Sequence, residues 1–325
     1  MRVGLDIGGT KIDAVVLDDD LNVIAKVGIP TGLGPDRVLA SGERAVREVV
    51  AVRDASLREV SCVGIGIPGM VDAATGEVRH AVNLELEHLA LADELALRIG
   101  APVRVENDVK AAALGAYHLL GLSGSAALLN LGTGLAAGIV VDGRLWRGAE
   151  GGAGEIGHIS VVPGGALCSC GQRGCLETIA SGSAVARLWP SETEPPAVAL
   201  FDAADAGDPR AQDVRRALAE GVASAVRVLV LTVDVGTVVI AGGLSNLGDR
   251  LLAPVRDVLR DWSADSAFLA SLGLASRVRM LPPELSAAAV GAALAGGVGP
   301  VGGAALVEQT GTGTRELLEG HPWKS

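Results

Sequence analysis

The residues with the most definite chemistry in this chain are one histidine and three cysteines. In chain order they are His158, Cys168, Cys170 and Cys175. A closed structural zinc site binds four nitrogen or sulfur ligands in a tetrahedron, and one imidazole with three thiolates is a common ligand set. Two intervening glycines, Gly171 and Gly174, would let the loop fold around a metal because glycine accepts positive φ angles. The pattern predicts a zinc site, and the alternative is a disulfide with one spare thiol.

Two carboxylates flank this cluster. Glu155 precedes the histidine in the segment Gly-Ala-Gly-Glu-Ile-Gly-His, and Glu177 follows Cys175 by two residues. A bound metal would draw Glu155, His158 and Glu177 to one place. Carboxylate oxygens and the second ring nitrogen of the histidine could there hold the hydroxyl groups of a polyhydroxylated ligand. The alternative is that both glutamates are solvated loop carboxylates.

Two glycine-rich turns, more than 120 residues apart, each separate a pair of strand-like segments. The segments are 3–7 and 12–17 around the first turn, and 127–131 and 137–141 around the second. The turn residues are Gly8, Gly9, Thr10, Lys11, Gly132, Thr133 and Gly134. The repetition predicts a duplicated fold in which each half offers a turn to one shared ligand.

Such turns let backbone N–H groups approach a polyphosphate. Asp6 could hold magnesium through water beside the first turn, and Lys11 would add a cation for the phosphates. Each turn by itself is equally consistent with a plain tight hairpin. Neither turn has the spacing of a P-loop or of a dinucleotide-binding motif, which disfavours both of those nucleotide folds.

The remaining apolar patterns alternate between strands and helices, as an α/β fold requires. Predicted strands are 23–27, 62–67, 103–106 and 237–240. Predicted helices are 37–53, 108–120, 211–230 and 286–295. Cys62 alternates with apolar neighbours in its strand, so we expect it in the core rather than as a reactive thiol.

The chain length and charge limit the possible classes of protein. With 325 residues the chain can hold two domains with proper cores. There are 38 acidic and 27 basic residues, a net charge of -11 and no basic stripe, which argues against nucleic acid as a partner. No apolar stretch reaches the roughly 18 residues of a membrane span. The N-terminus has no signal-peptide pattern, so we expect a cytoplasmic protein with no membrane partner.

Six motifs occur together in one order: Asp-Ile-Gly-Gly-Thr-Lys, Gly-Ile-Pro-Gly, Glu-Asn-Asp, Leu-Gly-Thr-Gly, Gly-Glu-Ile-Gly-His and Cys-x-Cys-Gly-x-x-Gly-Cys-x-Glu. From about residue 3 to 297 the chain thus resembles the ROK family of sugar kinases, in particular its zinc-containing, glucokinase-like members. The resemblance implies an α/β, actin-like or ribonuclease H-like two-domain fold with duplicated βββαβα-type halves. We expect a small domain at 1–110, with helix 286–297 packed back on it, a large domain at 111–285 that carries the zinc loop, and a weakly ordered tail at 298–325.

The resemblance also implies roles for individual residues. Asp108 would be the general base on the sugar hydroxyl, as phosphoryl transfer requires, although Asn107 and Asp108 alone could form an ordinary helix N-cap. The implied sugar-binding residues are Gly69, Asn83, Asn107, Asp108, Glu155, His158 and Glu177. Gly242 and Gly243, a third glycine corner after a strand, join the two turns and Asp6 as nucleotide-binding residues. The implied cofactors are ATP, Mg2+ and structural Zn2+.

The expected reaction is ATP-dependent phosphorylation of a hexose, with glucose favoured over N-acetylmannosamine, N-acetylglucosamine, mannose and fructose. A polyphosphate donor and a non-catalytic sugar sensor are the alternatives. A repressor of the same family would carry a DNA-binding domain before the first motif, and that motif begins at Asp6. The family leads us to expect a homodimer or a dimer of dimers. Three departures from its pattern are Lys110 in place of Asn, Ala116 in place of an acid, and the sugar-loop sequence at 84–87.

Overall fold

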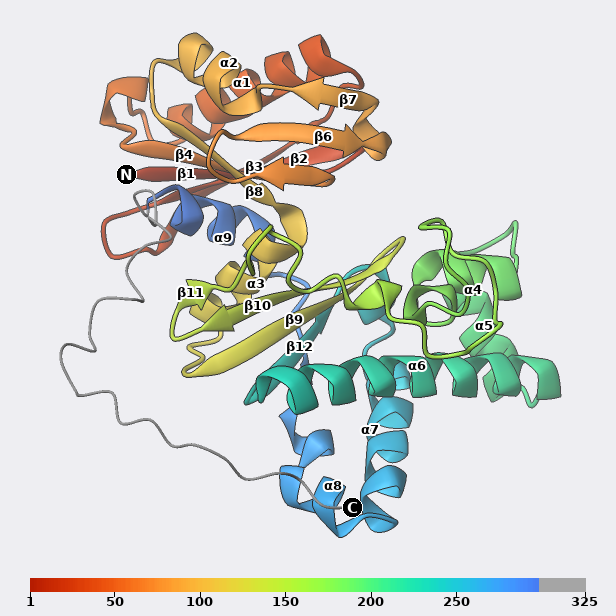
Figure 1. Cartoon of the computed structure of the whole chain (residues 1–325). Helices are drawn as coiled ribbons and strands as arrows, with labels where there is room; N and C mark the ends of the chain where they lie inside the picture. Colours follow the sequence, from red (N-terminus) through yellow and green to blue (C-terminus); the bar gives the residue numbers. More distant parts are fainter. Residues whose placement is uncertain (298–325) are drawn as a thin grey trace, which may run out of the picture.

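The computed structural model describes residues 1–297, and the predicted tail at 298–325 lies outside the described residues. Two five-stranded mixed sheets lie one above the other in Figure 1, and helices separate and cover them. A smaller three-stranded sheet extends the first of the two large sheets to one side. None of the helices in the described part of the chain is long and apolar enough to cross a membrane.

The first large sheet has the strand order β3-β2-β1-β4-β8. Its strands are β1 (Arg2–Ile7), β2 (Lys11–Leu17), β3 (Val23–Pro30), β4 (Cys62–Ile67) and β8 (Val103–Asn107). β1, β2 and β3 pair antiparallel, whereas β4 and β8 add in parallel. Helices α1 (Pro35–Ala51) and α2 (Leu91–Ile99) pack on one face of this sheet. Every residue of the inner strand β4 is buried, including Cys62, which confirms the predicted place of this cysteine in the core.

The second large sheet repeats the first, with the order β11-β10-β9-β12-β13. Its strands are β9 (Ser125–Leu131), β10 (Leu135–Val141), β11 (Arg144–Leu145), β12 (Thr237–Ala241) and β13 (Val278–Met280). Three antiparallel strands are again followed by two parallel ones, because long helical connections precede β12 and β13. Helices α6 (Pro209–Val233) and α7 (Asp249–Ala264) cover one face. The predicted duplication is therefore confirmed.

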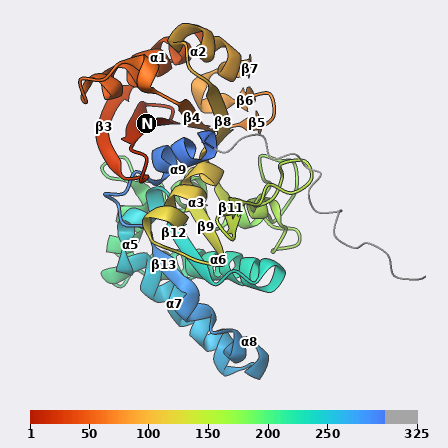
Figure 2. The ribbon, with the colours of Figure 1, turned by 90° about the vertical axis from the view of Figure 1, so that its left-hand side faces the viewer.

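Helices α3 (Asp108–Leu119) and α9 (Ala287–Gly296) cross between the two sheets, as Figures 1 and 2 show. α9 packs on β1 and β4 of the first sheet, and α3 packs on β10 and β9 of the second. Glycines permit this close crossing: a Cβ at Gly115 would lie 1.8 Å from the carbonyl oxygen of Ala287, and one at Gly291 would lie 1.7 Å from that of Ala111. The crossing fixes the start of α3 between the two halves.

The small sheet was not predicted from the sequence, because its strands are short and mostly exposed. It consists of β5 (Met70–Asp72), β6 (Glu77–Ala81) and β7 (Leu86–Leu89), with the short helix η2 (Val82–Leu84) between the last two strands. The elements not yet named are η1 (Leu57–Glu59), η3 (Ile156–His158), η4 (Leu176–Thr178), α4 (Gly182–Leu188), α5 (Pro196–Asp205), η5 (Gly243–Leu247), α8 (Ala267–Leu272) and η6 (Leu274–Arg277).

Candidate functional site

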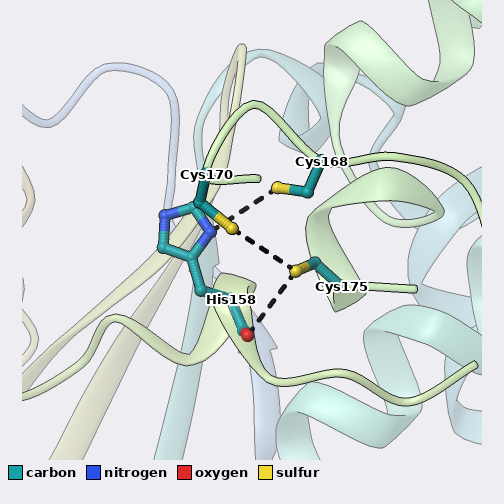
Figure 3. A group of neighbouring side chains, drawn as sticks. All are labelled: His158, Cys168, Cys170 and Cys175. Carbon is teal, nitrogen blue, oxygen red and sulfur yellow. Dashed lines mark hydrogen bonds between the residues drawn. The ribbon is translucent and has the colours of Figure 1, made fainter. Parts of the chain in front are cut away.

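The four predicted metal ligands converge in one cluster (Figure 3). Their donor atoms, from His158, Cys168, Cys170 and Cys175, all lie within 4.8 Å of one another. Cys168 Sγ is 3.7 Å from His158 Nδ1, and Cys170 Sγ is 3.7 Å from Cys175 Sγ. A disulfide would require about 2.05 Å, and all three cysteines are free, so the disulfide alternative is wrong. Sulfur ligands about 2.3 Å from one tetrahedral zinc ion would themselves be about 3.7 Å apart.

The loop around this cluster is shaped by glycine, as predicted. Gly171 and Gly174 have φ angles of 89° and 73°. A Cβ on Gly174 would also lie 1.7 Å from the carbonyl oxygen of Val162, so no larger residue fits there. N–H groups of Gln172 donate to Cys170 and lower the pKa of this thiol to about 6. The thiolate, which is the form that binds metals, is therefore favoured at Cys170.

The predicted base lies at the first residue of α3. Asn107 caps this helix: its Oδ1 accepts hydrogen bonds from the backbone N–H of Val109 at 3.1 Å and of Lys110 at 3.2 Å. The Asn107 Nδ2 donates to the carbonyl oxygen of Gly69 at 3.4 Å, which joins two of the predicted sugar-binding residues. The N-cap interpretation is thus correct. It is also compatible with a binding role, because the cap orients Asp108 at the helix start.

Four carboxylates interact electrostatically at this position. Burial, and next the negative charges of Asp108 and Asp13, raise the pKa of Asp6 to about 7. Burial is also the main cause that raises the pKa of Asp108, and the charge of Glu155 adds to it. Asp6 and Asp13 are cross-strand neighbours in the β1–β2 pair. A site with this much negative charge favours a proton or a cation.

The first glycine turn lies against the small sheet. Gly8 N–H donates to the carbonyl oxygen of Lys11 at 3.0 Å and closes the turn between β1 and β2. A Cβ on Gly9 would lie 3.2 Å from the carbonyl oxygen of Asn83, so this predicted sugar-binding residue is next to the turn. Lys11 Nζ is 2.8 Å from Asp13, and its side chain is 67% exposed. The lysine is therefore free to reorient toward an anion at little cost in burial.

The second glycine turn is held by the segment that follows the metal cluster. Gly182 N–H donates to the carbonyl oxygen of Gly132 at 2.7 Å, and Ser183 N–H donates to that of Thr133 at 3.2 Å. Leu135 N–H donates to Glu177 Oε2 at 3.1 Å. Glu177 is thus beside the turn as well as beside the cysteines, and it connects the metal-binding loop to the predicted phosphate-binding turn.

The Gly134 Cα is also close to Glu177, since a Cβ there would lie 2.4 Å from Glu177 Oε2. The third glycine corner reaches the same turn through Asn130, whose Oδ1 would be 2.6 Å from a Cβ on Gly242. Sequence reasoning did not single out Asn130, Gly182 or Ser183. The position of Asn130 at the end of a strand that leads into a glycine turn was the available indication.

The departures Lys110 and Ala116 are both on α3 and both buried. Ala116 belongs to the apolar cluster between the two sheets, where an ionised acid would be costly. Lys110 donates a hydrogen bond to the carbonyl oxygen of Gly151. Glu106, which precedes the Asn-Asp pair, forms an ion pair with Arg147 that the sequence also did not indicate.

Two mixed sheets of the same strand order, with α3 and α9 closely packed between them, define an actin-like, ribonuclease H-like α/β fold. The model of the ROK family matches residues 2–294, and the chain belongs to this family. The resemblance found in the six motifs is thereby confirmed.

Named relatives agree with this assignment. The chain is 35% identical over 290 residues to the glucokinase of Streptomyces coelicolor, which covers 81% of this chain and 88% of the relative. It is 33% identical over 269 residues to the N-acetylmannosamine kinase of Citrobacter koseri, with 79% and 88% covered. Among solved structures, the ROK glucokinase from Streptomyces griseus in complex with glucose and AMPPNP has a TM-score of 0.72 and 32% identity, with 91% and 98% covered.

Proposed function

We propose that this protein is an ATP-dependent hexose kinase, with glucose as its preferred sugar and Asp108 as the general base. The observation that carries the proposal is the position of Asn107 and Asp108 at the start of α3. The charge of Glu155 helps to raise the pKa of Asp108, and the charge of Asp108 helps to raise the pKa of Asp6. The relatives named glucokinase support glucose, and the relative named N-acetylmannosamine kinase supplies the alternative substrate.

The proposed reaction needs one proton acceptor. The sugar hydroxyl gives its proton to the Asp108 carboxylate while its oxygen attacks the γ-phosphorus of ATP, and the bond from that phosphorus to the ADP oxygen breaks. The raised pKa of Asp108 suits this role, because a carboxylate with a higher pKa is a stronger base. Asn107 would orient the sugar beside it, together with Gly69, Asn83, Glu155, His158 and Glu177.

The two glycine turns and the Gly242–Gly243 corner would hold the nucleotide through their backbone N–H groups. Asp6 fits an Mg2+ site reached through water, because burial and then the charges of Asp108 and Asp13 make its ionised form unfavourable, and a divalent cation would compensate that negative charge. When bound, Mg2+ supplies charge neutralisation for the phosphates. Lys11 would turn from Asp13 toward the same phosphates.

The cluster of His158, Cys168, Cys170 and Cys175 fits structural Zn2+ in its donor set and its spacing. Bound zinc would cross-link the loop that carries these four residues, which has little regular structure. Glu155 precedes this cluster and Glu177 follows it, so the same loop would hold both carboxylates for the ring hydroxyls. We also propose the division into a small domain at 1–110 and a large domain at 111–285, and a homodimer or a dimer of dimers as the assembled form.

A coupled ADP-release assay with Mg-ATP, across hexoses and N-acetylhexosamines, tests the proposal. We expect turnover with glucose well above that with the other sugars. Higher turnover with N-acetylmannosamine would identify that sugar as the preferred substrate. Turnover only with polyphosphate would identify polyphosphate, instead of ATP, as the phosphoryl donor. No turnover with any sugar or donor, for folded protein with zinc bound, would refute a kinase and favour a sugar sensor.

A further inference from the structure

The loop that joins β11 to η3 leads directly to Glu155. Backbone hydrogen bonds hold its two ends to β10: Trp146 N–H donates to Ile139 O at 2.9 Å, and Ala137 N–H donates to Gly154 O at 2.8 Å. The middle of the loop has few interactions of its own. Its internal hydrogen bonds are Ala153 N–H to Arg147 O at 3.1 Å and Glu155 N–H to Gly152 O at 3.4 Å. The loop contains four glycines, several with positive φ, and a Cβ at Gly151 or Gly152 would meet only open space. A segment of this composition does not fix its own conformation.

One restraint on the loop comes from Glu106, the last residue but one of β8. Its side chain is only 6% exposed. Glu106 Oε2 accepts from Arg147 Nε at 2.8 Å and lies 2.6 Å from Arg147 Nη2, while Oε1 accepts from the backbone N–H of Asn107 at 3.1 Å. One carboxylate therefore joins the start of the loop to the Asn107–Asp108 corner. An ion pair whose carboxylate is buried, with both oxygens accepting hydrogen bonds, is geometrically specific.

The second restraint comes from Lys110, in the first turn of α3. This lysine is only 8% exposed, and its ammonium donates to the carbonyl oxygen of Gly151 in the middle of the loop. The backbone N–H of Lys110 is bound by the Asn107 cap, so the lysine is anchored to the same corner. Burial of a lysine is costly unless its charge is compensated. The ammonium group therefore depends on its acceptor at Gly151, and this contact restrains the loop.

We propose that Lys110 and the Glu106–Arg147 ion pair form a clamp that sets the position of Glu155 relative to Asp108. The clamp connects the helix that carries the base to the loop that carries a sugar-binding carboxylate. Lys110 is thus a positioning residue for the sugar, and this inference rests on the proposed kinase function. An asparagine at position 110, the residue of the family pattern, is too short to reach Gly151 from the same backbone position.

The test compares Lys110→Met with Lys26→Met, which changes an exposed lysine of β3. Hydrogen–deuterium exchange of peptides covering 148–155 is measured first, because it needs no turnover. We expect faster exchange in this segment for Lys110→Met only. We further expect the KM for the sugar to rise about tenfold, because this factor corresponds to the free energy of one hydrogen bond from a charged group. The KM for ATP stays unchanged.

Unchanged exchange at 148–155 would overturn the clamp, and so would faster exchange with an unchanged KM for the sugar. If Lys110→Met does not fold, Lys110→Asn decides by the same two measurements, since its shorter side chain is polar and also removes the ammonium group from Gly151. If the unsubstituted protein phosphorylates no sugar, the proposed function fails, and the exchange experiment still decides whether Lys110 holds the loop. Sugar binding by calorimetry then replaces KM as the second measurement.

Discussion

Replacing Asp6 by asparagine tests the electrostatics of the site through the stability of the protein. Asp6 is close to the carboxylates of Asp108 and Asp13. Burial and these two charges raise its pKa from 3.8 to about 7 in the folded protein. The folded state therefore keeps a proton on Asp6 up to about pH 7, whereas the unfolded state loses it near pH 3.8. Between these values the folded state binds more protons, so this group's contribution to stability is lost as the pH rises.

The size of the effect follows from the shift. About three pKa units at 1.36 kcal/mol per unit give an upper bound of about 4 kcal/mol at pH 8. Because Asp6 is only partly shielded from solvent, we expect about 2–3 kcal/mol. Asp6→Asn has no charge to bury. It should thus be more stable than the unsubstituted protein at pH 8, by a margin that falls to about 1 kcal/mol or less at pH 4.5.

Urea unfolding at both pH values, followed by far-UV circular dichroism without magnesium or nucleotide, measures the difference. Asp20→Asn, at an exposed position in the turn before β3, is the matched control and should show no pH-dependent difference. An equal stability difference between Asp6→Asn and the unsubstituted protein at pH 4.5 and pH 8 would refute the reasoning. It would mean that Asp6 is already ionised in the folded protein at the lower pH.

Three further substitutions test the base, the metal cluster and the helix crossing. Asp108→Asn should lower kcat by about 10³-fold while the Kd for the sugar from calorimetry stays similar, and substantial retained turnover would remove Asp108 from the role of base. Cys170→Ala should lose zinc by elemental analysis, whereas Cys62→Ala should keep it; an unchanged zinc content in the first variant would contradict the ligand assignment. Gly291→Ala should destabilise the fold by about 3 kcal/mol in thermal unfolding, because its methyl group would overlap the carbonyl oxygen of Ala111, and an unchanged Tm would show that α9 can shift.

The metal cluster could be predicted because its determinants are local. The three cysteines and their glycines fall within one short loop, so residue type and spacing describe nearly the whole site. The start of α3 was predictable for the same reason, since the asparagine at its N-cap acts on backbone groups two and three residues away. Helix boundaries were less accurate: α6 was expected at 211–230 and runs from Pro209 to Val233, because Asp208 caps it earlier.

Contacts between distant segments could not be predicted from residue type. Glu177 was expected to contact sugar hydroxyls, and its carboxylate accepts a hydrogen bond from Leu135, 42 residues earlier. Glu106 and Arg147 are separated by 41 residues, and so are Lys110 and Gly151. Nothing in the local sequence distinguishes these charged residues from the exposed ones, because their partners are defined only when β8, α3 and the loop before η3 come together.

The sequence by itself determined the family, the α/β class, the repeated strand–turn–strand units and the residues of the metal cluster, since each depends on neighbours within a few positions. The roles of the individual site residues stay predictions. Tertiary structure alone decided how α3 and α9 cross, how the four carboxylates of the site interact, and which charged side chains are buried against their partners. These properties depend on distances across the chain, and both burial and electrostatic energy are set by what surrounds a group in space.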